Sequence, residues 1–312
     1  MKNIIEVKNL TKKYGKLKAL DNFSFEVKEN EIFGLLGPNG SGKTTAINSI
    51  LGLLKINEGE ILIFDQKMTP DAYHLKQDIG VVLQNVAVFD YLTVYENVDY
   101  FCGLYIKDKV KRKSLVEEAL KIVGLIEHQK QFPPKLSGGL LRRLNIACGI
   151  AHKPKLLFLD EPTVAVDPQS RNNILESIKK LNKQGTTIIY TTHYMEEVEF
   201  LCDRVIIIDH GKKIAEGSVD QLKNMIDIGE TITLELKEVD KNQIEKIKKL
   251  KNVSEVIQNE NILIIYYQKK NQNMLHLLEL LKDENLETIS INLQTPTLND
   301  VFLEITGREL RD

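Results

Sequence analysis

Residues 37–45 read Gly-Pro-Asn-Gly-Ser-Gly-Lys-Thr-Thr. It follows the apolar run EIFGLL (31–36) and precedes the helix-like run AINSILGLL (46–54). The spacing G-x-x-x-x-G-K-T between a strand and a helix predicts a phosphate-binding loop, because glycines let backbone N–H groups curl around an anion at a helix N-terminus. A plain Gly-rich turn is the alternative.

Each part of this loop has an expected task. Lys43 would reach the β- and γ-phosphates of a nucleotide, and the Thr44 hydroxyl would hold Mg²⁺. The residues expected to bind the nucleotide are Gly37, Pro38, Asn39, Gly40, Ser41, Gly42, Lys43, Thr44 and Thr45.

A second anchor for the metal follows another apolar run. Residues 156–159 (LLFL) end in Asp160 and Glu161. We expect Asp160 to hold Mg²⁺ through water, and Glu161, one residue further, to polarise an attacking water. A solvated acidic strand end is the alternative for an Asp-Glu pair alone.

Three further residues complete the expected site. Gln84 closes the run GVVLQ and could sense both Mg²⁺ and the water, so we assign it to catalysis and to the metal. His193 closes the run TTIIYTTH and could contact the γ-phosphate. Asp167 lies in a short turn after the acidic pair. Alone, each would be ordinary: a strand-end Gln, a structural His and a turn Asp.

Composition sets limits on the rest. A length of 312 residues favours two domains, since one core rarely serves more than about 250 residues. A formal net charge of -2 gives no electrostatic case for nucleic acid as a partner. Cys102, Cys148 and Cys202 form no CxxC pair and are expected to be buried small hydrophobes in a reducing compartment. Without a signal peptide or a run of about 18 apolar residues, we expect a soluble, intracellular chain that does not span a membrane by itself.

The pattern of apolar and polar residues changes after about Gly217. Before it, short apolar runs closed by Gly, Asp or Thr alternate with helical patterns, which predicts an α/β fold with a mostly parallel sheet. After it, strand-like and helix-like runs follow the order β-α-β-β-α-β and end in a helix near residues 298–307, typical of a small α+β domain, ferredoxin-like in its order. Residues 217–229 are the expected linker.

The stretch LSGGLLRRL (136–144) pairs a serine and two glycines with a basic run. Gly138 and Gly139 would let backbone N–H groups approach an anion at a helix start, where Ser137 offers a hydroxyl. Beyond them, Leu141, Leu144 and Ile146 are expected to face the core, with Arg142 and Arg143 outward. A Ser N-cap with a Gly-rich entry turn is the alternative.

Taken in order, Tyr14, GPNGSGKTT, Gln84, LSGGL, LLFLDEP, Asp167 and His193 resemble the nucleotide-binding subunit of an ABC transporter over residues 3–220. The resemblance implies a P-loop NTPase domain at 1–218 with a helical subdomain at about 85–150, and an accessory domain at 230–312. It also implies that Tyr14 stacks on adenine and that Gln84 begins the segment that touches the membrane subunits.

The same resemblance implies the ligands and partners. ATP and Mg²⁺ are the expected cofactors, bound by a head-to-tail homodimer or by this chain paired with a similar cassette. Ser137, Gly138, Gly139 and Asp167 would then contact the nucleotide of the other subunit. Separate transmembrane permease subunits are the expected partners, with no nucleic acid, which places the chain peripherally on the cytoplasmic face of the membrane.

Further stretches resemble one branch of that family. Residues 160–171, 192–205 and 297–312 are similar to bacterial exporters of drugs, antibiotics, lipids or polysaccharides. Two positions depart from the family pattern: Leu140, where Gln is usual, and Ala165, where Gly is usual. We expect Leu140 to be tolerated. The run at 86–105 offers apolar groups for a coupling helix of the permease, although they could instead pack in the subdomain core.

A rival function is a soluble ABC-type ATPase in translation, repair or cofactor assembly. Such proteins usually carry two cassettes, a long coiled coil or a basic arm, none of which this sequence shows. A GTPase is less favoured, because residues 182–185 (NKQG) lack the Asp of the N-K-x-D motif.

Overall fold

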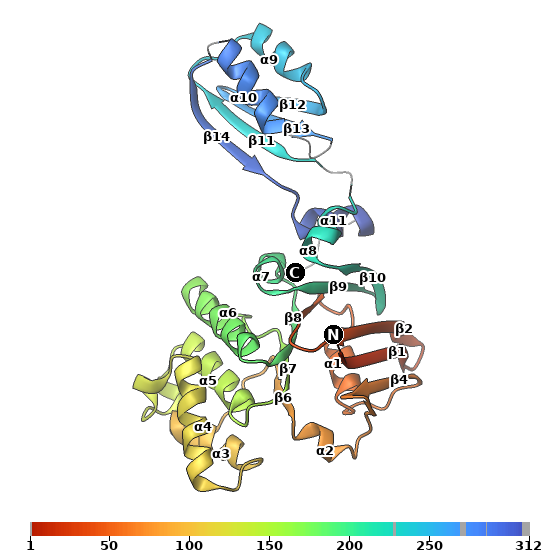
Figure 1. The fold of residues 1–312 in the computed structure, drawn as a ribbon, viewed down its shortest axis with the longest axis vertical. Helices are drawn as coiled ribbons and strands as arrows, with labels where there is room; N and C mark the ends of the chain where they lie inside the picture. Colours follow the sequence, from red (N-terminus) through yellow and green to blue (C-terminus); the bar gives the residue numbers. More distant parts are fainter. Residues whose placement is uncertain (1, 227–228, 269–272, 285, 308–312) are drawn as a thin grey trace. The chain divides into compact units, whose positions relative to one another are not determined.

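The computed structural model describes residues 2–226, 229–268, 273–284 and 286–307 (Figure 1). The chain forms two compact units, residues 1–219 and residues 220–309.

A six-stranded sheet forms the centre of the first unit, in the order β10-β9-β3-β8-β7-β6. Its strands are β3 (Ile32–Leu36), β6 (Ile79–Val82), β7 (Leu156–Asp160), β8 (Thr187–Thr192), β9 (Arg204–Asp209) and β10 (Lys212–Gly217). Five of them run parallel, and β10 is antiparallel at one edge. Strands β3, β7 and β8 are buried along their whole length, which explains their continuous apolar sequences.

A second, antiparallel sheet has the order β2-β1-β4-β5. Its strands are β1 (Asn3–Tyr14), β2 (Leu17–Lys28), β4 (Glu58–Ile63) and β5 (Gln66–Lys67). One apolar core joins this sheet to the central sheet and to helix α1 (Lys43–Ile50). Within it the rings of Phe25 and Phe33 stack 5.3 Å apart.

Helices α3 (Val94–Gly103), α4 (Lys109–Ile122) and α5 (Gly138–Ile150) gather on one side of the first unit in Figure 1. Short 3₁₀ turns at Ile126–His128 and Pro133–Lys135 connect α4 to α5. Thr93 and Glu96 form a capping box at the start of α3. The remaining helices of this unit are α2 (Tyr73–Lys76), α6 (Pro168–Lys183) and α7 (Met195–Leu201).

The three cysteines are buried and unpaired, as expected. Burial raises the pKa of the Cys102 thiol to about 11. Burial also raises the pKa values of Cys148 and Cys202, so all three thiols stay protonated near neutral pH.

The second unit carries a four-stranded antiparallel sheet in the order β12-β13-β11-β14. Its elements are α8 (Val219–Lys223), β11 (Thr231–Leu236), α9 (Lys241–Lys248), β12 (Val253–Asn259), β13 (Ile262–Tyr267), α10 (Asn273–Asp283), β14 (Thr288–Gln294) and α11 (Leu298–Thr306). The expected β-α-β-β-α-β order and terminal helix are therefore confirmed. The expected linker is wrong in part, because α8 is helical and buries Leu222.

Candidate active site

The loop between β3 and α1 needs its glycines for conformation and for space. Gly40 and Gly42 have φ angles of 79° and 114°, in the left-handed region. A Cβ at Gly37 would lie 2.2 Å from the carbonyl oxygen of Ile208, and a Cβ at Gly42 would lie 2.7 Å from that of Ala19. The loop therefore packs directly against the backbone of Ile208 and Ala19.

Ser41 shows that this loop suits an anion. Its hydroxyl oxygen is buried, yet no other group in the described part of the chain forms a hydrogen bond with it. Buried polar atoms are nearly always paired, so an unpaired hydroxyl here fits an anion bound at the loop. It lies just before the first turn of α1, where backbone N–H groups favour negative charge.

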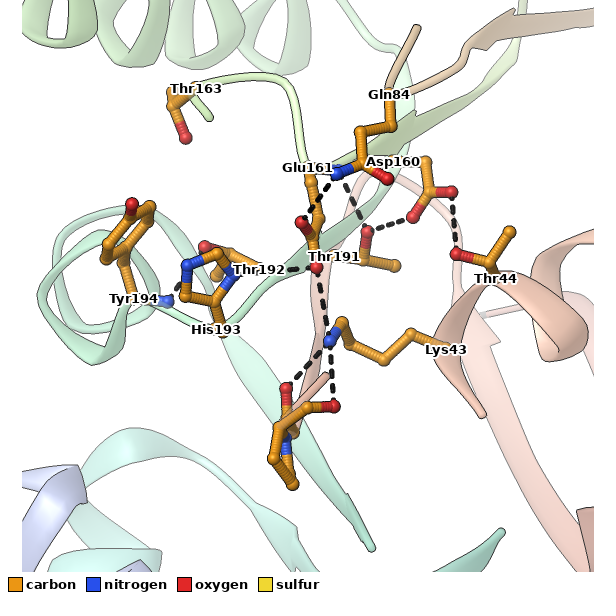
Figure 2. Close-up of polar contacts among 12 residues, drawn as sticks. Lys43, Thr44, Gln84, Asp160, Glu161, Thr163, Thr191, Thr192, His193 and Tyr194 are labelled. Carbon is orange, nitrogen blue, oxygen red and sulfur yellow. Dashed lines mark hydrogen bonds and ion pairs between the residues drawn. The ribbon is translucent and has the colours of Figure 1, made fainter. Parts of the chain in front are cut away.

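Lys43 is buried at the centre of the site (Figure 2). Its ammonium group donates to the carbonyl oxygens of Gly37 at 2.8 Å and Pro38 at 3.2 Å. It also lies 3.2 Å from Oε1 of Glu161. The side chain therefore connects the phosphate loop to the acidic end of β7.

Asp160 is held by two hydroxyl groups. Thr44 donates to Oδ2 at 3.0 Å, and Thr191 donates to Oδ1 at 2.6 Å. Sequence reasoning missed Thr191, although the parallel pairing of β7 and β8 sets Asp160 beside it. Hydroxyl and carboxylate oxygens are the ligands that Mg²⁺ prefers, with phosphates and water completing its shell. No cluster of three His, Cys, Asp or Glu side chains among the described residues could hold a metal without such help.

Glu161 is surrounded by polar groups of Gln84, His193 and Thr191. Gln84 donates to Oε2 from 3.4 Å, and Nδ1 of His193 lies 3.5 Å from Oε1. The backbone N–H of Glu161 donates to the hydroxyl of Thr191 at 3.0 Å. Its φ angle of 47° is unusual for a residue with a side chain, and such strain is common at functional sites. Figure 2 shows these side chains converging from the ends of three strands.

A pocket of about 450 Å³ opens beside this cluster. Its lining comprises Tyr14, Leu17, Lys18, Ala19, Asn39, Gly40, Gly42, Lys43, Thr44, Thr45, Gln84, Glu161, His210 and Gly211. Tyr14 is 48% exposed, and the ammonium group of Lys12 lies 4.9 Å from the centre of its ring. Sequence reasoning also missed His210, which lines the pocket. The tight turn between β9 and β10 brings it here, because Gly211 donates to the carbonyl oxygen of Ser41 at 2.8 Å.

The residues expected to act on a second subunit do not line this pocket. Ser137 caps α5 by accepting from the N–H of Leu140 at 3.3 Å, as the N-cap alternative required. Asp167 caps α6 by accepting from the N–H of Ser170 at 2.9 Å. A Cβ at Gly139 would lie 2.2 Å from the Ser170 hydroxyl oxygen, whereas a Cβ at Gly138 would meet nothing within 4 Å.

The expectation that Arg142 faces outward is wrong. The side chain is 4% exposed and donates to four backbone carbonyl groups at the ends of β6 and β7. Burial lowers the pKa of the guanidinium, and nearby Tyr190, Asp160 and Glu161 oppose that shift. Arg143 is half-buried and binds the carbonyl oxygen of Val123. The helical pattern does not predict this burial, because the carbonyl groups that Arg142 binds follow two strands that are distant in the sequence.

Comparison with known proteins gives the family. Residues 20–164 match the family described as ABC transporter, and residues 217–306 match the one described as ATP-binding protein DrrA1-3-like, C-terminal domain. The linearmycin resistance ATP-binding protein LnrL of Bacillus subtilis (strain 168) is 40% identical over 99% of this chain and 100% of its own length. The chain belongs to the ABC transporter ATP-binding proteins.

Other ABC proteins agree with this placement. The daunorubicin resistance ATP-binding protein DrrA2 of Streptomyces coeruleorubidus is 32% identical over 97% of this chain and 95% of its own length. Among solved structures, a dimeric ATP-binding cassette in a post-hydrolysis state with ADP and Pi is 32% identical, with a TM-score of 0.62, over 69% of this chain and 98% of that one. The expected P-loop NTPase fold is confirmed, and the chain is an ATPase that binds ATP.

In this ABC cassette the departure at Ala165 has a structural consequence. Its φ angle is 59°, so the turn between the acidic pair and α6 uses the left-handed conformation. That conformation favours glycine, because a Cβ crowds the following carbonyl oxygen. The methyl group of Ala165 therefore adds backbone strain to the turn, an effect that the sequence did not disclose.

Proposed function

We propose that this ABC ATPase powers a membrane exporter, and that two cassettes close around two ATP molecules in each cycle. The observation that carries the proposal is the convergence of Lys43, Thr44, Asp160 and Glu161 beside the Ser41 loop, in a chain that matches ABC relatives over its full length. Each part of the cluster has a task in that cycle.

The pocket accommodates a nucleotide along its length. The loop amides, the Ser41 hydroxyl and Lys43 would receive the phosphates, and the exposed ring of Tyr14, which also lines the pocket, would stack on the adenine. A γ-phosphate competes with Glu161 for Lys43, which lies 3.2 Å from that carboxylate. ATP binding would therefore release Glu161 from its ion pair.

Thr44, Asp160 and Gln84 are the residues that would hold Mg²⁺. When bound, the ion neutralises charge that develops on the phosphate oxygens. Thr191 keeps Asp160 oriented toward Thr44, because its hydroxyl bonds the other carboxylate oxygen at 2.6 Å.

Glu161 is the residue that would polarise water. The carboxylate accepts a proton while the water oxygen bonds to the γ-phosphorus, and the bond to the leaving oxygen of ADP breaks. His193, 3.5 Å from the same carboxylate, would contact the γ-phosphate and fix its position. Gln84 would orient the water from the opposite side.

The second half of the phosphate site comes from another subunit. Ser137 and Gly138 are exposed at the start of α5, and Gly138 has open space where a Cβ would stand. A γ-phosphate can approach such a helix start closely. With Asp167 at the neighbouring start of α6, these residues would cover the nucleotide of a partner cassette.

The surface around 86–105 is the proposed contact with the permease. Val94, Val98 and Cys102 pack in the core of the helical region, whereas Val86, Tyr91, Tyr100 and Leu104 are exposed. The exposed residues are the ones that we propose contact the permease. In the described part of the chain no helix has the length and apolar character needed to cross a bilayer. The proposed permease is a separate subunit, and the cassette would bind it at the cytoplasmic face.

The cargo class follows from the relatives. Those compared above are named for resistance to linearmycin and to daunorubicin, and another, from Sinorhizobium fredii, is named for Nod factor export. We propose that the partner permease exports a drug, an antibiotic or a lipid-like molecule of this kind.

Co-expression with the candidate permease tests the function. Membranes carrying both proteins should hydrolyse ATP and move cargo, while Glu161→Gln should retain ATP affinity and lose turnover. Retention of more than about a tenth of wild-type hydrolysis, a barrier change below roughly 1.4 kcal/mol, would contradict the Glu161 assignment. Stoichiometric recovery with ribosomes and none with membranes would favour a soluble ABC-type ATPase instead.

A further inference from the structure

We propose that Arg142 is a positioning residue, which ties the first helix turns of LSGGLLRRL to the two side chains that handle the attacking water. The inference rests on the proposed roles of Glu161 and Gln84. It concerns how these two groups are fixed relative to each other and to the start of α5.

One guanidinium reaches both strand ends. Nε donates to the carbonyl oxygen of Pro162 at 2.8 Å, and one terminal nitrogen donates to that of Glu161 at 2.8 Å. The other terminal nitrogen donates to the carbonyl oxygens of Gln84 at 2.7 Å and Leu83 at 3.2 Å. Arg142 thus bonds the main chain of both functional residues and of one neighbour of each.

These bonds lie where the sheet no longer connects the strands. The parallel pairing of β6 with β7 ends at Val82 and Leu159, so the residues that follow have no ladder between them. Gln84 is exposed and lies outside any helix or strand. Arg142 bridges the two diverging ends, and it is a planar, always charged donor suited to several acceptors at once.

Asn145 secures the same segment one turn along α5. Its Oδ1 accepts from the N–H of Ala87 at 3.1 Å, and its Nδ2 donates to the carbonyl oxygen of Leu83 at 3.4 Å. Residues three apart on a helix share one face, so Arg142 and Asn145 form a single grip on residues 83–87.

Through these bonds a movement of α5 would be passed on to Gln84 and Glu161. Ser137, at the N-cap of α5, precedes Arg142 by five residues, or about 7.5 Å along a rigid helix. A partner nucleotide that engages Ser137 and Gly138 would shift α5, and Arg142 would carry that shift to both Gln84 and Glu161. Hydrolysis would in this way depend on closure of the second subunit.

The test compares Arg142→Lys with Arg143→Lys in the full chain. Lysine keeps the charge of Arg142 but lacks the fork that reaches four carbonyl groups. The control residue also bonds backbone carbonyl groups, those of Val123 at 3.2 Å and Gly124 at 3.5 Å, but these lie at the end of α4 rather than at Gln84 or Glu161. We expect Arg142→Lys to lower kcat at least tenfold with the KM for ATP changed less than threefold, and Arg143→Lys to keep kcat within threefold.

A second comparison separates positioning from general damage. Glu161→Gln preserves the carbonyl group that Arg142 binds, so adding Arg142→Lys to it should leave the residual turnover within twofold. A merely destabilising substitution would lower both backgrounds by the same factor. Asn145→Ser, which loosens the segment at Ala87 without touching the guanidinium, should lower kcat two- to tenfold, and this variant serves if Arg142→Lys does not fold.

Several results would overturn the proposal: a folded Arg142→Lys protein with kcat within threefold of wild type, an equal loss in Arg143→Lys, or an equal loss in the Glu161→Gln background. An unchanged kcat in Asn145→Ser would overturn it as well. If Glu161→Gln itself keeps a tenth or more of the activity, the proposed role of Glu161 fails first. Inactive Glu161→Gln beside fully active Arg142→Lys would refute the positioning role alone.

Discussion

Gly138 and Gly139 are adjacent, yet the structure predicts opposite effects for the same substitution to Ala. At Gly139 the added Cβ would lie 2.2 Å from the Ser170 hydroxyl oxygen and 2.4 Å from its Cβ. Relieving that overlap requires α5 and α6 to move apart, and overpacking of this kind costs about 1–3 kcal/mol. For a unit of 219 residues each kcal/mol lowers Tm by about 2–4 °C, so Gly139→Ala should melt roughly 2–12 °C lower.

Gly138→Ala should leave the fold intact. Nothing lies within 4 Å of the added methyl group, and alanine is a better helix former than glycine by about 0.5–1 kcal/mol in a helix interior, less in the first turn. The methyl group would instead meet the phosphate of a partner cassette. We expect wild-type ATP affinity and Tm, with hydrolysis reduced at least tenfold, equivalent to about 1.4 kcal/mol in the barrier.

The assay for both variants combines thermal melting, ATP binding by calorimetry at low protein concentration and steady-state hydrolysis. Each variant is the control for the other, because the two differ only in what surrounds the methyl group. Hydrolysis by Gly138→Ala within threefold of wild type would show that no nucleotide approaches this residue. A Tm of Gly139→Ala equal to that of wild type would refute the packing argument.

Three other predictions follow from individual residues. Ala165→Gly should raise the free energy of unfolding by about 0.5–1 kcal/mol because it relieves a left-handed φ of 59°, whereas Ala147→Gly inside α5 should lower it. Thermal or urea unfolding measures both changes, and a lower free energy of unfolding for Ala165→Gly would contradict the strain at this residue. Burial lowers the pKa of His152 in the folded chain, so the unfolded chain binds more protons and the stability falls as the pH drops below the unfolded pKa of about 6.5. Between pH 7.5 and pH 5.5 the Tm of wild type should therefore fall more than the Tm of His152→Gln. Equal decreases in Tm would exclude His152 as the cause. Leu140→Gln should change hydrolysis by less than about tenfold, or 1.4 kcal/mol, since Leu140 contributes only its backbone N–H to the Ser137 cap; a larger gain would show that the side chain at this place matters.

Much of the architecture could be predicted because it follows local rules. Continuous apolar runs marked the buried parallel strands, and the glycine spacing of residues 37–42 marked the loop between strand and helix. The second unit followed its alternation of strand-like and helix-like runs. The linker was the exception, because a five-residue helix such as α8 is too short to show a clear period.

The candidate site was less accessible to sequence reasoning where its contacts are tertiary. Thr191 faces Asp160 only because β7 and β8 pair in one particular register. His210 reaches the pocket because the turn after β9 packs on the phosphate loop. Arg142 lies in a helix pattern that predicts exposure, and its burial depends on carbonyl groups from two strands that the helix meets in the folded chain.

We expect two copies of this chain to close around two ATP molecules, and the mass of the Glu161→Gln variant tests this claim. Sedimentation equilibrium with Mg²⁺ and ATP should give a dimer with two bound nucleotides, and adding Gly138→Ala should return it to a monomer that still binds ATP. A monomer under all these conditions, in the presence and absence of the partner permease, would contradict the claim.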